Sequence, residues 1–324
     1  MKLFDIFPTP RFLTLTDAGV SISERTVRYI SFRPSGSGDL HIEFSGEIAL
    51  PEGVVSQGEV KDKEKLVEIL SQLSRDKGIR FVKATLPEER AYLFTTAVDR
   101  VPYKDLRDAV AFLIEENAPV SLSKSLFSFE ILDNPDNFKV AVSVLPTDVA
   151  QTYIETFEAA GLTPVSFDIE SQAISRALVK RGDERAHLII YLGHNRVGFY
   201  LVNDGVVQFS TTMVIDVADS ENPETIKALK LEIRKFFSFW SSKVDANSIP
   251  NQKVERIIIG GPWAKDEKLV SSIMSDVETP YSLGNVWINV SDIEKRLPDM
   301  SFEESLAYAA AVGAALRGGR EEYV

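Results

Sequence analysis

The chain has 324 residues, 44% of them hydrophobic and 26% charged, and its 48 acidic side chains outnumber the 36 basic ones to give a formal charge of −12. A surface this acidic repels nucleic acid and anionic lipid, so we expect no nucleic-acid partner, and the absence of cysteine excludes disulfides and thiol chemistry. No run reaches the roughly 18 apolar residues of a membrane span, and residues 1–12 do not read as a signal peptide, so we expect a cytoplasmic chain of about two domains.

The beginning of the chain reads as a β-meander, a helix and a further strand. Alternating apolar residues predict three strands, at residues 13–23, 27–32 and 40–50. An amphipathic helix follows at 63–77, where Asp62 is a suitable N-cap and Gly78 a suitable residue to end the helix. Residues 80–86 form the next predicted strand.

A compact block then has the order strand, helix, strand, strand, helix, which suggests a small α+β unit inserted into a larger fold. Its elements are expected at residues 92–101, 103–117, 126–132, 138–145 and 147–160. A strand at 162–168 and a helix at 170–180 lead to a polar boundary at 181–184.

After this boundary the pattern starts again. Residues 187–202 look like two strands around a turn at 194–196. The remaining predicted elements are a strand at 206–213, a long helix at 223–244, a buried strand at 254–259 and an alanine-rich helix at 302–316.

The two halves open alike. In residues 21–30 and again in 191–200, an apolar strand enters a short polar turn and a second apolar strand leaves it, with the same spacing. Such duplication is the architecture of actin-like proteins, in which two related domains flank a cleft. Chance similarity of two hairpins is the alternative.

The order and spacing of several motifs resemble the PilM family, the actin-like component of type IV pilus systems, which is related to FtsA. The matching segments are residues 20–32, 58–66, 84–87, 102–106, 160–165, 168–173, 257–264 and 307–318. The resemblance implies an α/β, actin-like (ribonuclease H-like) fold of two domains, 1–180 and 181–324. A small subdomain is inserted at about 90–162, and the C-terminal helix returns toward the first domain.

In actin-like proteins two hairpin turns grip the phosphates of a nucleotide, and an Asp before each turn organises Mg²⁺. Here Ser21 and Tyr191 stand at the two Asp positions, and Ser23 replaces the glycine of the first turn. Glu24 lies in that turn, where a carboxylate would face phosphate; two like unit charges 4 Å apart repel by about 4 kcal/mol at an effective dielectric near 20. We therefore expect weak or no nucleotide binding, no ATP hydrolysis, no bound metal and no catalytic residue.

The resemblance still marks a residual nucleotide cleft. Its residues are Ser23, Thr26, Arg28, Asp168, Glu170, Gly193, Gly260, Gly261 and Trp263. Five of them have a structural alternative. Asp168 and Glu170 could cap the helix at 170–180, the two glycines could serve a tight turn, and Trp263 could stack on adenine or fill an empty cleft. Arg196 could contact phosphate or be a solvated turn residue.

Other chemistries find no support in the sequence. It has no GxxxxGK loop, no GxGxxG after a strand and no GxSxG elbow. Its three histidines, His41, His187 and His194, lack metal-ligand spacing. Glu115 and Glu116 are adjacent on a predicted helix and point in different directions, which favours a solvated face over acid–base catalysis.

The resemblance also implies a partner. Members of the family recruit the N-terminal cytoplasmic tail of the inner-membrane protein PilN, in a groove between the first domain and the inserted subdomain. The strand at 92–101 and the helix at 103–117 are expected to form one wall. The protein would then be peripheral at the inner face of the cytoplasmic membrane, with other pilus platform components nearby. The alternatives are an active actin-like ATPase and a scaffold of a related type II secretion system.

Overall fold

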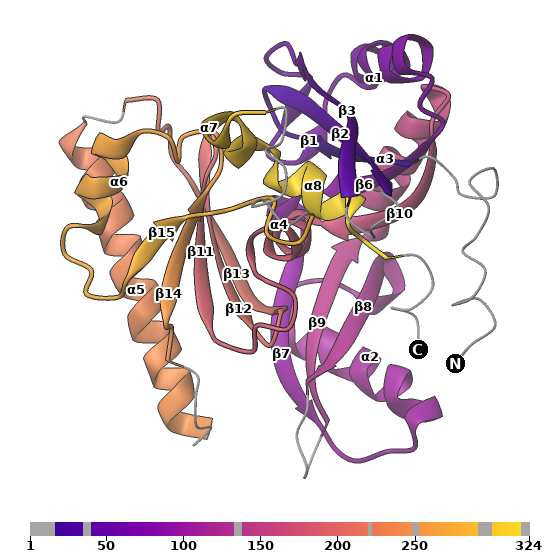
Figure 1. Cartoon of the computed structure of the whole chain (residues 1–324). Coiled ribbons are helices and arrows are strands. Elements are labelled where there is room, and N and C mark those ends of the chain that lie inside the picture. The colour runs from indigo at the N-terminus through magenta and orange to yellow at the C-terminus, as the bar shows by residue number, and fades with distance from the viewer. Residues whose placement is uncertain are drawn as a thin grey trace.

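The computed structural model describes residues 17–34, 40–132, 138–219, 222–247, 253–290 and 300–318. Two lobes lie side by side, each built on a five-stranded sheet, and a third, smaller unit lies below the first lobe (Figure 1). No helix within these ranges is long and apolar enough to cross a membrane.

The first sheet has the order β10-β6-β1-β2-β3. Its strands are β1 (Asp17–Ile22), β2 (Thr26–Pro34), β3 (Leu40–Ala49), β6 (Phe81–Leu86) and β10 (Thr163–Ile169). The first three form an antiparallel meander, β6 pairs in parallel with β1, and β10 pairs in parallel with β6. The predicted strand ends 13–16 and the loop residues 35–39 lie outside the described residues.

The second sheet repeats this topology with the order β13-β12-β11-β14-β15. Its strands are β11 (His187–Leu192), β12 (Arg196–Asn203), β13 (Val206–Val214), β14 (Arg256–Gly260) and β15 (Tyr281–Leu283). Again three strands form an antiparallel meander and two more follow in parallel. The duplication predicted from the two opening hairpins is therefore confirmed.

Helix α1 (Lys63–Lys77) begins and ends as its sequence predicts. The carboxylate of Asp62 accepts the backbone N–H of Lys65 at 2.9 Å, and Gly78 takes the left-handed conformation with φ of 64°. Its apolar face packs with helix α3 (Thr147–Ala159) in the core of the first lobe. Two short strands, β4 (Val55–Ser56) and β5 (Glu59–Val60), lie just before α1.

The smaller unit is a three-stranded sheet, β7-β9-β8, covered by helix α2. Its elements are β7 (Tyr92–Val98), α2 (Leu106–Asn117), β8 (Ser125–Leu132) and β9 (Phe138–Pro146), joined by single 3₁₀ turns at Tyr103–Asp105 and Leu122–Lys124. It has its own apolar core. The helix α3, which we expected to belong to this unit, instead buries Tyr153 and Phe157 in the core of the first lobe.

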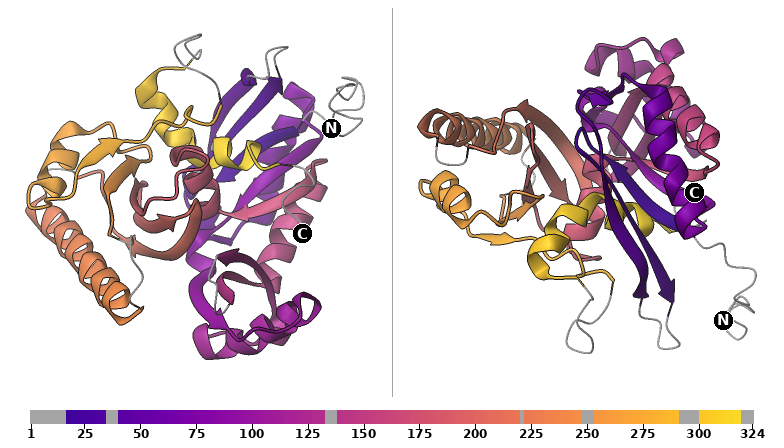
Figure 2. Two further views of the ribbon diagram at one scale, coloured as in Figure 1. Left: turned by 60° about the horizontal axis from the view of Figure 1, so that its bottom comes forward. Right: turned by 90° about the horizontal axis from the view of Figure 1, so that it is seen from above.

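The second lobe carries α5 (Pro223–Asn247) and α6 (Glu267–Met274) on one face of its sheet (Figure 2). Helix α4 (Glu170–Leu178) lies between the lobes and contacts the last helix, α8 (Ala309–Ala315). The predicted helix 302–316 is interrupted: α7 (Phe302–Ser305) and α8 are separated by a 3₁₀ turn at Leu306–Tyr308. We attribute this turn to packing, because Leu306 belongs to the core of the second lobe and Tyr308 to the core between the lobes.

Helix α8 returns to the first sheet. Its alanine-rich face meets Gly19 of β1, and Gly313 lies so close to the carbonyl of Ala173 that a Cβ atom there would overlap it. Beyond the helix, the ammonium of Lys83 donates to the carbonyl of Arg317 at 2.8 Å and forms an ion pair with Asp17 at 3.0 Å. The segment 309–317 therefore completes the first lobe.

Candidate functional site

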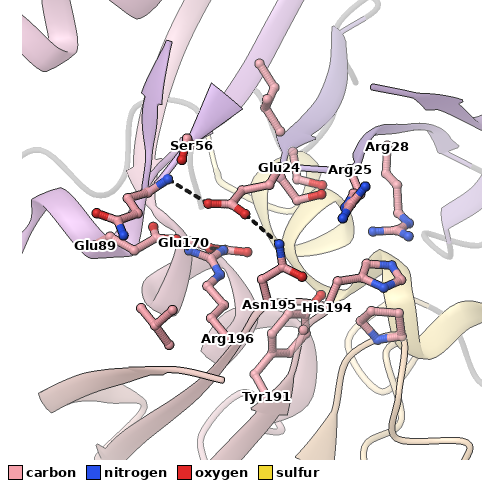
Figure 3. Close-up of a pocket in the computed structure, with 17 residues that line it drawn as sticks. Glu24, Arg25, Arg28, Ser56, Glu89, Glu170, Tyr191, His194, Asn195 and Arg196 are labelled. Atoms are coloured by element: carbon pink, nitrogen blue, oxygen red, sulfur yellow. Dashed lines mark hydrogen bonds and ion pairs between the residues drawn. The ribbon is translucent and has the colours of Figure 1, made fainter. Parts of the chain in front are cut away.

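A cavity of about 260 Å³ lies between the two hairpin turns that open the lobes (Figure 3). The first turn joins β1 to β2, and the second joins β11 to β12. The lining residues are Ser21, Ile22, Ser23, Glu24, Arg25, Arg28, Ser56, Gln57, Glu89, Glu170, Tyr191, Gly193, His194, Asn195, Arg196, Val214 and Pro262. The cleft predicted from the duplicated hairpins is therefore present.

Both turns are closed by similar backbone hydrogen bonds. The N–H of Ser23 donates to the carbonyl of Thr26 at 2.9 Å, and the N–H of Gly193 donates to the carbonyl of Arg196 at 3.0 Å. In the first turn the hydroxyls of Ser23 and Thr26 also lie 3.0 Å apart. In the second, a Cβ atom on Gly193 would lie 2.9 Å from the Arg196 carbonyl, which explains the glycine.

Glu24 connects the two turns. One carboxylate oxygen accepts the backbone N–H of Gln57 at 2.6 Å, and the other accepts the side-chain amide of Asn195 at 2.9 Å. Figure 3 shows the Glu24 side chain directed between these two donors. The carboxylate that we expected to repel phosphate therefore has partners within the chain.

Arg196 forms a second set of contacts across the cleft. Its guanidinium makes ion pairs with Glu89 and Glu170, and all three side chains are largely buried. Burial raises the pKa of Glu170 to about 7, against the attraction of Arg196. Burial by itself would lower the pKa of Arg196. The negative charges of Glu170 and Glu89 have the larger effect and raise this pKa well above its usual value, so the guanidinium stays charged. The interpretation of Arg196 as a solvated turn residue is therefore wrong.

The residues at the two former Asp positions are both buried. Ser21 is 8% exposed and Tyr191 is 6% exposed. Burial, followed by the nearby Glu170, raises the pKa of Tyr191 to about 12, so this phenol is neutral near pH 7. Arg28, at 7% exposure, is held by an ion pair with Glu47 at 2.6 Å.

The structure separates the predicted site residues into two groups. Ser23, Arg28, Glu170 and Gly193 line the cavity. Thr26, Asp168, Gly260, Gly261 and Trp263 do not line it. That the first group binds a nucleotide stays a prediction.

Asp168 lies in a different place from the cavity. Its carboxylate pairs with Arg176 at 2.6 Å and also with Arg317, so it fastens the end of the chain to the first lobe. Neither Asp168 nor Glu170 caps α4, because the N-cap Ile169 makes no side-chain bond and Glu88 accepts the N–H of Ser171 at 3.0 Å. Gly261, with φ of 97°, lies against the backbone of Leu192, as the tight-turn reading expects.

Trp263 has a partner of its own. Its indole N–H donates to Nδ1 of His194 at 3.1 Å, and the rings meet edge to face. Burial, followed by Arg28 and Arg25, lowers the pKa of His194 and keeps Nδ1 free to accept this bond. The side chain is partly buried against the core of the second lobe.

The cavity residues fit Mg²⁺–ATP poorly. Three arginines line the cavity, and each already forms an ion pair with a glutamate of the chain. A volume of about 260 Å³ lies below the ~300–1,000 Å³ of usual ligand pockets. Within the described residues no group of three or more His, Asp or Glu side chains could hold a metal ion.

Sequence reasoning missed several of these contacts. Glu89 lies in no motif that pointed to the cleft, Asn195 lies in the second turn but was not singled out, and Gln57 contributes only a backbone N–H there. The one available signal was the second turn itself, since Asn195 and Arg196 are both part of it.

A larger groove of about 1,020 Å³ lies between the inserted unit and the two lobes. The inserted unit contributes Tyr103, Arg107 and β8 residues 126–131, and the first lobe contributes residues of β10 and α4. That a partner binds here stays a prediction. Of the two elements expected to form one wall, the start of the helix at 103–117 lines this groove, whereas β8 lines it in place of β7. The reason is that β7 faces the second lobe instead, where the hydroxyl of Thr95 donates to the Gln208 carbonyl at 2.9 Å.

The groove is more basic than the protein as a whole. Five cationic residues line it against three acidic ones, whereas the whole chain carries a formal charge of −12. The cations are Arg107, Arg176, Lys180, Arg181 and Arg317, and the anions are Glu130, Asp168 and Asp204. Exposed apolar side chains, Leu126 and Tyr103, lie among them.

Two sheets of equal topology that face each other across paired hairpin turns define an actin-like protein. The chain is similar over 95% of its length to 98% of a chain in a solved PilM–PilN type IV pilus biogenesis complex, with 16% identity and a TM-score of 0.74. It is also similar over 96% of its length to 92% of the ethanolamine utilization protein EutJ from Carboxydothermus hydrogenoformans, with 11% identity and a TM-score of 0.50. No curated protein matches it.

A family model described as type IV pilus assembly protein PilM matches residues 19–213, which is more than half of the chain. The protein belongs to this family. The predictions of an actin-like fold and of PilM-type membership are both confirmed.

Proposed function

We propose that this protein is a scaffold of a type IV pilus assembly machine that binds the N-terminal cytoplasmic tail of a PilN-like inner-membrane protein. Two findings support the proposal. The chain belongs to the PilM family, and a chain of the same fold was solved as a PilM–PilN complex. The protein would then be cytoplasmic and reach the inner membrane, and other platform components, through this partner.

The observation that carries the proposal is the edge of β8 in the large groove. Among the described strands β8 is hydrogen-bonded to β9 alone, so its other edge is free to pair. The residues along this edge line the groove of about 1,020 Å³. An extended tail can add to such an edge through main-chain hydrogen bonds and take its specificity from side-chain contacts.

We further propose that the scaffold works without hydrolysing ATP. Hydrolysis in this fold needs a metal ion to neutralise charge that develops on the phosphates. Ser21 and Tyr191 offer no carboxylate for this ion, and the three arginines of the cavity are already paired with glutamates of the chain. Phosphate release from Mg²⁺–ATP should therefore stay at background, and calorimetry should detect no binding in the low micromolar range.

A direct test uses calorimetry with a synthetic peptide of the partner's N-terminal tail. Leu126 of β8 is 50% exposed and lines the groove, so a Leu126→Asp variant should weaken binding about tenfold or more, equivalent to about 1.4 kcal/mol. Leu231 of α5 is 51% exposed and lies outside the groove, so Leu231→Asp is a matched control that should bind normally. Equal affinities of the two variants would exclude β8 as the docking strand.

A further inference from the structure

The structure places one acidic side chain where it links the two lobes directly. Glu24 and Asn195 are 171 positions apart in sequence, yet the side-chain amide of Asn195 donates to the Glu24 carboxylate at 2.9 Å. The other oxygen of Glu24 accepts the Gln57 N–H at 2.6 Å, so both oxygens of the carboxylate are used. Figure 3 shows this side chain between the segment of Ser56 and the second turn.

We propose that Glu24 is an internal occupant of the cleft, an autoinhibitory contact that holds the lobes together and excludes anions from the space between the two turns. Its carboxylate accepts hydrogen bonds from both sides of the cleft, as a bound anion would. An external anion would have to displace a group that is covalently part of the turn. This inference concerns the state of the cleft and is independent of the groove at β8.

The charges of the cavity agree with this assignment. Arg25, Arg28 and Arg196 line it together with Glu24, Glu89 and Glu170. Arg28 is paired with Glu47, and Arg196 is paired with Glu89 and Glu170. Removing the Glu24 carboxylate therefore takes one negative charge from the cavity wall and leaves the Gln57 N–H and the Asn195 amide without their acceptor.

The ion pairs of Arg196 form a second connection between the lobes, on the side of the second turn. Arg196 begins β12 of the second lobe, whereas Glu89 follows β6 of the first lobe and Glu170 begins α4. Two separate sets of side-chain contacts therefore join the lobes across the cleft.

The experiment measures the distance between the lobes and the affinity for inorganic pyrophosphate on the same variants. Because the chain has no cysteine, Glu64→Cys on α1 and Lys227→Cys on α5 place two spin labels at exposed positions without a competing thiol. Double electron–electron resonance then reports the lobe separation. Calorimetry with pyrophosphate reports access to the cleft.

Three variants separate the effect of the Glu24 carboxylate on anion binding from the effect of its hydrogen bond to Asn195 on the lobe distance. Glu24→Ala removes the carboxylate, so the label distance should broaden and pyrophosphate should bind at least tenfold more tightly than to the natural chain. Asn195→Ala breaks the link but keeps the carboxylate, so the distance should broaden with no gain in pyrophosphate affinity. Glu303→Ala removes an exposed glutamate that does not line the cavity, and should change neither measurement.

Glu24→Gln tests the charge alone, because an amide oxygen can still accept one of the two hydrogen bonds. It should keep a narrow distance distribution and gain pyrophosphate affinity. An unchanged distance distribution in both Glu24→Ala and Asn195→Ala would overturn the proposal. Equal affinities of the natural chain and of Glu24→Ala for pyrophosphate would also overturn the proposal.

Discussion

The indole N–H of Trp263 donates to Nδ1 of His194 across 3.1 Å, which joins the segment after β14 to the second hairpin turn. Burial, followed by Arg28 and Arg25, lowers the pKa of His194. The bond exists only while Nδ1 carries no proton. Protonation of Nδ1 therefore breaks this contact.

We expect acid to weaken this contact. Because the pKa of His194 is lower in the folded state, the unfolded chain takes up a proton first, and the stabilisation present above the ordinary histidine pKa of ~6.5 is lost as pH falls through the folded value. His194→Gln should therefore show a smaller loss of stability than the natural chain between neutral and mildly acidic pH. Urea unfolding followed by tryptophan fluorescence measures the difference, and parallel curves for the two proteins would contradict the prediction.

Glu170 should have the opposite dependence on pH. Burial raises its pKa from 4.5 to about 7, so its contribution to stability is complete below pH 4.5 and is lost as pH rises through about 7. Glu170→Gln cannot lose a proton, and relative to the natural chain its stability should rise by up to about 3 kcal/mol between pH 4.5 and 8. Denaturant titrations across this range measure the effect. The exposed Glu303→Gln serves as a control that should leave the profile unchanged.

The N-cap of α1 gives a prediction far from the cleft. Asp62→Ala removes the acceptor for the Lys65 N–H and should lower the free energy of unfolding by about 1 kcal/mol. Asp76→Ala changes an exposed aspartate in the last turn of the same helix and makes a matched control. Equal denaturation midpoints for these two variants would mean that the cap contributes nothing.

Gly313 should be among the least tolerant positions of the chain. A Cβ atom here overlaps the backbone of Ala173, which no side-chain rotation can relieve, so Gly313→Ala should cost about 3 kcal/mol or more as α8 is pushed from α4. A Cβ atom on Gly318 meets nothing within 4 Å, and Gly318→Ala should be neutral. Thermal unfolding compares the two. A normal melting temperature for Gly313→Ala would show that α8 docks more loosely than described.

Local sequence signals predicted the parts of the fold that depend on neighbouring residues. Asp62 and Gly78 mark the ends of α1 because capping involves residues only a few positions away. The repeated hairpins at 21–30 and 191–200 revealed the duplication because strand alternation and turn polarity are visible within one short window. Both lobes could therefore be anticipated.

Contacts between distant segments carry no such signal. Nothing near Glu24 in the sequence indicates that Asn195 will be its partner, and nothing near Glu89 points to Arg196. The break before Tyr308 was missed for a related reason. Helical periodicity runs through residues 302–316, but the two halves of this segment pack into different cores. Tertiary packing overrides propensity in such a case.

The docking of α8 on the first sheet has a consequence for synthesis. Gly19 and Ile30 belong to strands that leave the ribosome long before the helix that covers them, which lies almost 300 residues further along the chain. Part of the first sheet therefore stays uncovered in the nascent chain until the second lobe has been translated. Ribosome-stalled chains that end before residue 309 should engage chaperones that longer chains release.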